Sequence, residues 1–355
     1  MKIAIVTDAW RPQTNGVVTT LSRTVECLAE LGHDVHLMTP EGLRTVPCPT
    51  YSEIRLALGQ GRHVAAWLEA TAPDALHVAT EGPLGLAARR AAIRAGLRFT
   101  TSYHTQFPQY VRKRFPVPER VSYAALRWFH AAAERTLVGT REVRRDLRRH
   151  GFANLVEWTR GVDTRLFRPD AGPRLPYPGP VQIYVGRVAV EKSVEDFLRA
   201  DVPGTKLVVG GGPALEDLRA RYPEAIFTGY RYGAELAALL AGSDVFVFPS
   251  RTDTFGLVML EALASGLPVA AYPVTGPIDV VRQGDTGCLH EELATAIRGA
   301  LALDRSRCRA QALEYRWENA TRQFVGHLAD ARVARPVRRP LVARLSEAVT
   351  RLRNP

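Results

Sequence analysis

Two stretches in the second half of the chain combine charged side chains with glycines in a pattern suited to binding a phosphorylated ligand. Residues 244–266, DVFVFPSRTDTFGLVMLEALASG, are predicted to form a buried strand, a loop and a helix that begins near Gly256. The first turn of a helix offers free backbone N–H groups and the positive end of the helix dipole, which favour phosphate. Asp253 can accept hydrogen bonds from sugar hydroxyls, and Glu261 can hold a ribose diol. The alternative is that Asp253 only caps the helix and Glu261 pairs with an arginine.

The second stretch is GRVAVEK, residues 186–192. Arg187 follows a glycine at the end of a predicted strand, and Lys192 lies a few residues further on. Two cations in such a place can neutralise a diphosphate and the charge that develops when it leaves. The alternative is an exposed pair of cations at the start of a helix.

Three further predicted strand ends carry polar residues. The turn TNGVV, residues 14–18, resembles a phosphate-binding loop but lacks the G-x-G-x-x-G pattern. His104 in TSYHT and Glu81 in ATEGPLG also follow strands, which favours a role in substrate binding over burial on an apolar face. A purely structural role remains the alternative for both residues.

The sequence lacks the spacings of several other kinds of site. No D-x-D, H-x-x-x-H or C-x-x-C occurs, so a mechanism that depends on a divalent metal has no support. No P-loop, G-x-S-x-G or protein-kinase signature occurs either. The glycine-rich GGGP after KLVV does not have the spacing of a dinucleotide fingerprint.

The candidate residues lie on an alternation of strands and helices. In the first half, strands are expected at 2–7, 34–40, 75–80, 98–104 and 135–140, and helices at 15–32, 61–71, 84–95 and 118–133. In the second half, strands are expected at 181–186, 206–211, 225–230, 244–250 and 268–273, and helices at 193–200, 213–221, 233–241, 257–264 and 291–303. Strands alternating with helices of this length predict parallel sheets covered on both faces.

A proline-rich linker divides the alternation. Residues 168–180 contain five prolines and two glycines. We therefore predict an α/β protein with two doubly wound parallel-sheet, Rossmann-like domains that face each other across a cleft. The expected parts are a first Rossmann-like domain (1–167), the linker (168–180), a second Rossmann-like domain (181–315), a closing helix (316–330) and a basic amphipathic tail (331–355).

Composition and charge limit the class of protein. No apolar run approaches the roughly 18–20 residues of a membrane span, and the first residues read as a buried strand rather than a signal peptide. The four cysteines show no metal-ligand spacing, which predicts reduced thiols in a cytoplasmic protein.

The net charge of +11 is unevenly distributed. Residues 1–175 carry 25 Lys and Arg against 16 Asp and Glu, residues 176–330 carry 15 against 19, and residues 331–355 carry 7 against 1. This asymmetry indicates an anionic partner such as a nucleotide, a lipid surface or nucleic acid. The alternative is an arginine-rich surface that serves only solubility.

The motifs together resemble those of the retaining nucleotide-sugar glycosyltransferases of family 4, which have the two-domain GT-B fold. GRVAVEK and DTFGLVMLEALASG carry most of the resemblance, the latter as an E-x7-E signature with Asp for the first Glu. ATEGPLG, SYHTQF, RGVDTRLFRP and SRTDTFG resemble a narrower branch, the GDP-mannose-dependent α-mannosyltransferases and the glycosyl- and sulfoquinovosyl-diacylglycerol synthases. The resemblance extends to about residue 330 and implies metal-independent transfer of a hexose with retention at the anomeric carbon, without a cofactor. It also implies that residues 1–167 form the acceptor-side domain and residues 181–315 the nucleotide-sugar-binding domain.

The resemblance also implies roles for individual residues. His104 would approach the transferred sugar, Arg187 and Lys192 would bind the diphosphate, and Asp253 would contact sugar hydroxyls rather than act as a nucleophile. The remaining donor contacts would come from Asn15 and Gly16 beside the diphosphate, Tyr230 and Arg231 beside the nucleobase, the backbone of Phe255, Gly256, Leu257 and Val258, and Glu261 on the ribose. Asn at position 15 is expected to tolerate a left-handed backbone in place of the family's glycine. Gly211 stands where the family usually has an acid.

The acceptor and the location in the cell rest on basic segments. The segments with clustered arginines are 111–115, 141–150 and the tail, in which Leu341, Leu345, Val349 and Leu352 share a helical spacing. A basic amphipathic segment can lie on an anionic membrane, so we expect a lipid acceptor such as diacylglycerol, or a glycan, at the inner face of the membrane. A solvated tail without a role is the alternative.

Three rival functions differ in what they require. A nucleotide-sugar epimerase of the same fold would convert the donor without an acceptor, and would need more acids in the cleft. A nucleic-acid-binding protein would account for the charge, but the chain lacks interleaved aromatic and basic residues and a helix-turn-helix pattern, so no nucleic-acid partner is expected. An NAD-dependent oxidoreductase would need the dinucleotide fingerprint. The sequence gives no indication of oligomeric state.

Overall fold

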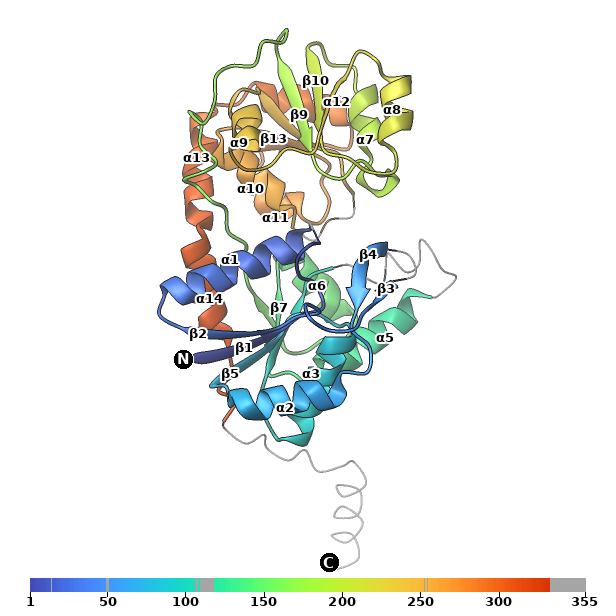
Figure 1. Ribbon diagram of the computed structural model, residues 1–355. Helices are drawn as coiled ribbons and strands as arrows, with labels where there is room; N and C mark the ends of the chain where they lie inside the picture. The colour runs from blue at the N-terminus through green and yellow to red at the C-terminus, as the bar shows by residue number, and fades with distance from the viewer. Residues whose placement is uncertain are drawn as a thin grey trace, which may run out of the picture.

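The computed structural model describes residues 1–332 with the exception of 14, 49–50, 106–107, 109–117, 252 and 254. Two six-stranded parallel sheets, one in each half of the chain, form two domains (Figure 1). The predicted α/β class with two doubly wound parallel sheets is therefore confirmed. None of the described helices is both long and apolar enough to cross a membrane.

The first domain is built on a sheet with the strand order β2-β1-β5-β6-β7-β8. Its strands are β1 (Lys2–Val6), β2 (Asp34–Met38), β5 (Ala75–Val78), β6 (Thr100–Tyr103), β7 (Arg135–Val138) and β8 (Leu155–Glu157). Its helices are α1 (Gly16–Glu30), α2 (Gly61–Thr71), α3 (Pro83–Arg94), α5 (Glu119–His130) and α6 (Arg141–Arg149). An antiparallel pair, β3 (Val46–Cys48) and β4 (Tyr51–Leu56), lies between β2 and α2 in the chain.

The second domain repeats this plan with the order β11-β10-β9-β12-β13-β14. Its strands are β9 (Val181–Val185), β10 (Thr205–Val209), β11 (Ile226–Gly229), β12 (Val245–Phe248), β13 (Val269–Ala271) and β14 (Gly287–Leu289). Its helical segments are η1 (Val190–Lys192), α7 (Val194–Arg199), α8 (Leu215–Arg221), α9 (Gly233–Ala241), α10 (Leu257–Ala264), α11 (Pro277–Val280), α12 (Leu293–Leu301), α13 (Ser306–Ala312) and η2 (Leu313–Tyr315).

The central strands are short apolar runs because helices cover both faces of each sheet. All residues of β5, β9 and β12 are buried. The last helix of the described residues, α14 (Trp317–His327), crosses from the second domain to pack against α1 of the first (Figure 1). Trp158 fixes it by donating its indole N–H to the carbonyl of Ala320 at 3.0 Å.

The sequence did not predict α6, α11, α13, β8, β14 or the β3–β4 pair. Most of these are three to seven residues long, and so short a segment carries too little periodicity to be recognised. Helix α6 has nine residues, but only Val143 and Leu147 are buried. Two apolar positions among many arginines are too few to give α6 a recognisable helical periodicity.

Each sheet has one point at which the strand order reverses. This switch point lies between β1 and β5 in the first domain and between β9 and β12 in the second. Ligands of open parallel sheets bind beyond the carboxyl ends of the strands at such points. The loops after these four strands are therefore the places to look for a site.

Candidate functional site

The switch point of the second domain brings two of the predicted site residues into contact. Lys192, at the end of η1, donates from Nζ to both carboxylate oxygens of Asp253 at 2.7 Å each. The two residues are 61 positions apart in the sequence, and their side chains keep 22% and 21% of their surface exposed. The predicted cation and the predicted carboxylate are thus one half-buried pair that a ligand can reach.

Asp253 does not cap the helix that follows it. The N-cap of α10 is Gly256, and no side chain makes the cap hydrogen bond. The φ angle of Gly256 is +80°, and a Cβ there would lie 2.8 Å from Met259 Cε and 3.0 Å from Phe248 Cζ. Glycine is therefore required at this turn. Leu257 and Val258 are the first two residues of α10, so their backbone N–H groups lie at the positive end of the helix dipole. This end of the helix follows the loop that carries Asp253, the partner of Lys192.

Glu261 sits in an apolar environment one turn into α10. Burial raises the pKa of its carboxyl group to about 7. Within the described part of the chain, no hydrogen bond or ion pair engages its carboxylate, so the alternative of an arginine partner finds no support. A carboxyl group that is neither paired nor fully charged is suited to gaining partners from a ligand.

This pKa gives donor binding a pH dependence if Glu261 holds a ribose diol. Below pH 7 the carboxyl group is mostly protonated, and it then loses the stronger hydrogen bonds of the charged form. We expect the Kd of a nucleotide diphosphate sugar to be about tenfold higher at pH 6 than at pH 8, because only the protein with an ionised Glu261 binds the ligand well. Calorimetry across this range measures the effect. Glu261→Gln should abolish the pH dependence, and a variant that kept it would contradict the assignment.

Arg187 lies on the same connection as Lys192, between β9 and η1. Its side chain is exposed, and its carbonyl accepts a hydrogen bond from the hydroxyl of buried Tyr184 at 2.8 Å. That bond fixes the backbone at the end of β9. The structure thus gathers Arg187, Lys192, Asp253 and Glu261 on the two connections that flank one switch point, and Lys192 contacts Asp253 directly.

Asn15 differs from the expectation. Its φ of −152° is extended rather than left-handed, and its side-chain oxygen caps α1 by accepting from the N–H groups of Val17 and Val18 at 3.0 and 3.1 Å. Its role is therefore that of an N-cap, which accounts for asparagine at this position. Gly16 lies opposite the second domain, because a Cβ on it would be 3.6 Å from Leu257 Cδ1. The starts of α1 and α10 are thus adjacent.

Tyr230 and Arg231 lie at the edge of the second sheet, after β11. The hydroxyl of Tyr230 donates to the carbonyl of Gly211 at 2.8 Å, and a Cβ on Gly211 would lie 2.7 Å from the Tyr230 ring. The ring is half exposed and stacks on Tyr232 with centroids 6.0 Å apart. Arg231 is exposed beside Glu235 at 3.7 Å. Close packing against Tyr230 explains the glycine at 211, and the stacked rings are a surface on which a base can lie.

His104 follows β6 in the first domain. The Nη2 group of Arg160 donates to its Nδ1 at 3.4 Å, so a neutral ring carries its proton on Nε2. Burial and the charge of Arg160 lower the pKa of His104 well below its usual range, which keeps the ring neutral. Arg160 in turn lies over the Trp158 ring and donates to the Trp158 carbonyl at 2.7 Å. His104 is thus a neutral N–H donor in a fixed orientation.

Two residues with structural importance at these loops were not assigned from the sequence. Arg160, within the quoted RGVD stretch, orients His104, and burial lowers its pKa only to about 10. Asp8 follows β1 and accepts from the backbone N–H groups of Leu84 and Gly85 at 2.8 and 3.2 Å. The signal for Asp8 was an acid directly after the first strand. Such an acid can cap a helix that the sequence places far away.

Comparisons with known proteins point in one direction. Residues 14–166 match the family described as Glycosyltransferase Family 4, and residues 179–302 match Glycosyl transferases group 1. A GDP-mannose-dependent alpha-mannosyltransferase of Mycobacterium tuberculosis is 33% identical over 81% of this chain and 83% of its own. Sulfoquinovosyl transferase SQD2 of Arabidopsis thaliana is 32% identical over 84% of this chain and 67% of its own.

Solved structures share the fold at lower identity. Sucrose-phosphate synthase from Thermosynechococcus elongatus has a TM-score of 0.74 at 22% identity, covering 92% of this chain and 97% of its own. Anabaena HepE in complex with UDP and glucose has a TM-score of 0.66 at 17% identity, covering 92% of this chain and 98% of its own. These likenesses show the GT-B fold.

Proposed function

Because the chain belongs to the family 4 and group 1 glycosyltransferases, we propose that it transfers a hexose from a nucleotide diphosphate sugar with retention at the anomeric carbon. The observation that carries the proposal is the contact between Lys192 and Asp253 at the start of α10, where a cation, a carboxylate and a helix N-terminus meet. GDP-mannose is the proposed donor, because relatives that align with 81% of this chain are named GDP-mannose-dependent alpha-mannosyltransferases.

Different charged groups would bind different parts of the donor. Lys192, Arg187 and the first turn of α10 would neutralise the diphosphate as it leaves. Asp253 would accept hydrogen bonds from hydroxyls of the sugar, and Glu261 would hold the ribose. Because the protein supplies these charges itself, we propose that transfer needs no metal. His104, a neutral donor from the opposite domain, would contact the transferred sugar.

The reaction is proposed to follow a front-face path. The acceptor hydroxyl attacks the anomeric carbon as the bond to the diphosphate breaks, and a phosphate oxygen of the donor takes the proton. Asp253 is engaged by Lys192 through both oxygens, which fits electrostatic binding rather than nucleophilic attack. Exclusion of water between the domains would protect the donor from hydrolysis.

Two measurements test the proposal. Calorimetry with GDP-mannose, UDP-glucose and ADP-glucose should give tight binding for one donor, with GDP-mannose favoured. Radiolabelled transfer into a lipid extract, with and without EDTA, should then give a labelled product with an α linkage. Absence of binding by all three donors would contradict the function. Conversion of the donor without an acceptor would favour an epimerase instead.

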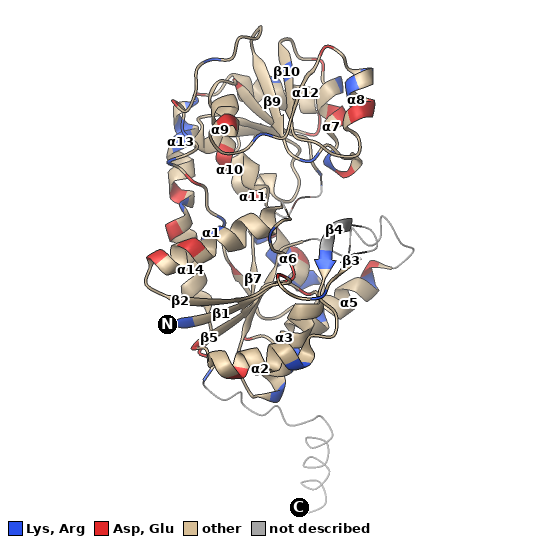
Figure 2. Ribbon diagram, viewed as in Figure 1, with Lys and Arg blue, Asp and Glu red and all other residues tan. Residues whose placement is uncertain are grey.

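A membrane-lipid acceptor is proposed on the charge distribution, a basis that is the same for the one-hydroxyl diacylglycerol and for a lipid with a polyhydroxylated head group. Figure 2 shows basic positions of the ribbon in blue. Helix α6 contains five arginines, of which four pair with Glu142 or Glu157: Arg141, Arg144, Arg145 and Arg149. These pairs reduce the attraction of α6 for an anionic surface. The other segments cited for membrane binding are residues 111–115 and the tail, residues 331–355. Apart from Ala331 and Arg332, they lie outside the described residues.

We expect deletion of residues 333–355 to weaken sedimentation with vesicles that contain phosphatidylglycerol by at least about tenfold, because each arginine near such a surface contributes about 1 kcal/mol. A cut after Arg332 preserves the fold, since the N–H of buried Ala331 donates to the Asp74 carbonyl at 2.8 Å and Arg332 pairs with the Asp74 side chain. Phosphatidylcholine vesicles serve as the control. Unchanged binding of the truncated chain would remove the tail from the proposal.

A further inference from the structure

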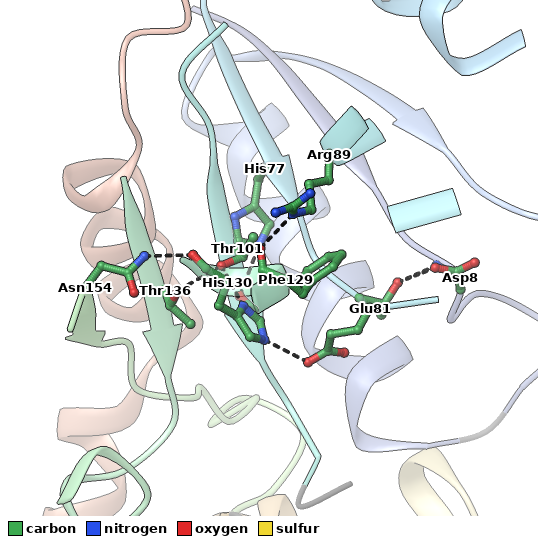
Figure 3. Close-up of polar contacts among 11 residues, drawn as sticks. Asp8, His77, Glu81, Arg89, Thr101, Phe129, His130, Thr136 and Asn154 are labelled. Carbon is green, nitrogen blue, oxygen red and sulfur yellow. Dashed lines mark hydrogen bonds and ion pairs between the residues drawn. The ribbon is translucent and has the colours of Figure 1, made fainter. Parts of the chain in front are cut away.

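A hydrogen-bonded series of buried polar side chains in the first domain ends at the partly exposed carboxylate of Glu81. Glu81 lies on the loop between β5 and α3, at the switch point of the first sheet. Its Oε1 is 3.1 Å from Nε2 of His130, whose side chain is fully buried while that of Glu81 is 27% exposed. The pair joins residues 49 positions apart (Figure 3). The sequence noted Glu81 only as an acid at a strand end.

The hydrogen bonds of this series have a defined direction. An ionised Glu81 only accepts, so Nε2–H of His130 donates to it. In the neutral ring Nδ1 then accepts from the hydroxyl of Thr101 at 2.9 Å, and Thr101 accepts from the hydroxyl of Thr136 at 3.0 Å. Every donor in this hydrogen-bonded series thus has an acceptor, and each hydrogen bond points toward the carboxylate of Glu81.

The backbone that carries His130 is also held in place. The guanidinium of buried Arg89 donates to the carbonyls of Phe129 and Trp128, both at 3.0 Å. The side-chain amide of Asn154 donates to the carbonyl of His130 at 3.0 Å (Figure 3). These bonds satisfy carbonyls at the C-terminal end of α5 and place a cation where the helix dipole favours one. His130 is therefore fixed both at its ring and at its backbone.

The neighbouring acid, Asp8, serves a different purpose. Both of its carboxylate oxygens are used within the fold, by Leu84, Gly85 and the hydroxyl of Thr80. Glu81 uses only Oε1, and its Oε2 makes no hydrogen bond with any described residue. Of the two carboxylates at this switch point, Glu81 is the one that can accept a hydrogen bond from a ligand.

We propose that Glu81 binds a hydroxyl group of the acceptor, and that His130 is the positioning residue that holds its carboxylate in the binding orientation. The inference rests on the proposed function and deepens it. Since the donor phosphate takes the proton of the reacting hydroxyl, Glu81 holds a second hydroxyl. The acceptor is accordingly a polyhydroxylated head group, a sugar or polyol, rather than a lipid with one hydroxyl.

The test compares two acceptors with GDP-mannose as donor: n-octyl β-D-glucopyranoside, which has several hydroxyls, and 1,2-dioctanoylglycerol, which has one. Glu81→Gln turns an accepting oxygen into an NH2 group, since the other oxygen stays on His130. We expect the KM for the glucoside to rise about tenfold, with kcat and the Kd of GDP-mannose within twofold of the unmodified enzyme.

Matched variants separate binding from folding. Glu134→Gln is the control, because Glu134 has a similar exposed fraction, 31%, and pairs with Arg98 at the amino ends of β6 and β7, away from Glu81. This variant should leave the KM for the glucoside unchanged. His130→Phe keeps an aromatic ring but removes the donor to Glu81, so it should raise the KM as Glu81→Gln does. His130→Gln keeps an N–H group at the place of Nε2 and should restore most of the affinity. A merely structural His130 would not give this rescue.

Three outcomes overturn the inference in distinguishable ways. An unchanged KM for the glucoside in Glu81→Gln, with transfer intact, would refute the role of Glu81 and leave the glycosyltransferase function standing. Preference of the unmodified enzyme for dioctanoylglycerol over the glucoside would refute the polyhydroxylated acceptor. Failure of the unmodified enzyme to bind GDP-mannose, UDP-glucose and ADP-glucose alike would refute the proposed function and the inference with it.

Discussion

Replacing Lys192 with glutamine is expected to lower kcat for sugar transfer by about 10²- to 10³-fold, the loss found when one preorganised donor to a developing negative charge is removed. The ammonium group lies at the switch point of the second sheet, beside the N-terminus of α10, and charge accumulates there as the diphosphate leaves. Its two 2.7 Å contacts with Asp253 fix its position before the donor binds. Preorganisation of this kind avoids reorganising charge during the reaction.

The loss should fall on the chemical step more than on donor binding. A ground-state diphosphate also contacts Arg187 and the helix N-terminus in the proposed mode, so the Kd of the donor should change less than kcat. Steady-state kinetics together with calorimetry separate the two effects. Arg219→Gln, which removes an exposed arginine paired with Glu216 on α8, is the matched control and should leave kcat unchanged.

Asp253→Asn shows whether Lys192 acts alone or as part of the pair. This variant keeps the size of the side chain but removes the charge that holds the ammonium group. A large loss in both variants is expected from a shared site. If Lys192→Gln retained kcat, the lysine would serve only to hold Asp253, and the electrostatic account of the leaving group would be wrong.

Gly210→Ala is expected to destabilise the second domain by about 3 kcal/mol or more. Gly210 follows β10, has a φ of +138°, and a Cβ on it would lie 1.8 Å from the carbonyl oxygen of Gly186. Backbone cannot move aside as a flexible side chain can, so the loop after β9 must shift. That loop carries Arg187 and Lys192, and donor binding should weaken together with stability.

Denaturant unfolding and donor calorimetry measure the two consequences. Gly326→Ala in α14 is the matched control, because a Cβ there would meet no atom within 4 Å. Alanine favours the helix, so this control should be neutral or stabilising by up to about 1 kcal/mol. Equal stability of Gly210→Ala and the unmodified protein would mean that the β9 loop accommodates the methyl group. The close packing of the two loops would then have no energetic weight.

The sequence alone determined the plan of the fold and supplied the candidate residues for donor binding. Strands such as β9 and β12 are buried on both faces, and their short apolar runs bounded by turn residues indicate strands without knowledge of their partners. Helix α10 was located from its glycine start and apolar pattern. Once alternation is known, parallel topology puts the loops after β9 and β12 at one edge, so Lys192 and Asp253 were candidates before any contact was seen.

Only the tertiary structure decided what each polar residue does. The pairing of Lys192 with Asp253, the orientation of His104 by Arg160 and the locking of Glu81 by His130 all join residues about 50 to 60 positions apart. Local pattern carries no information on such contacts, because a polar side chain finds its partner through packing of the whole domain. The backbone of Asn15 was misread for a different, local reason: a turn residue that caps a helix and one that adopts a left-handed backbone have the same sequence context.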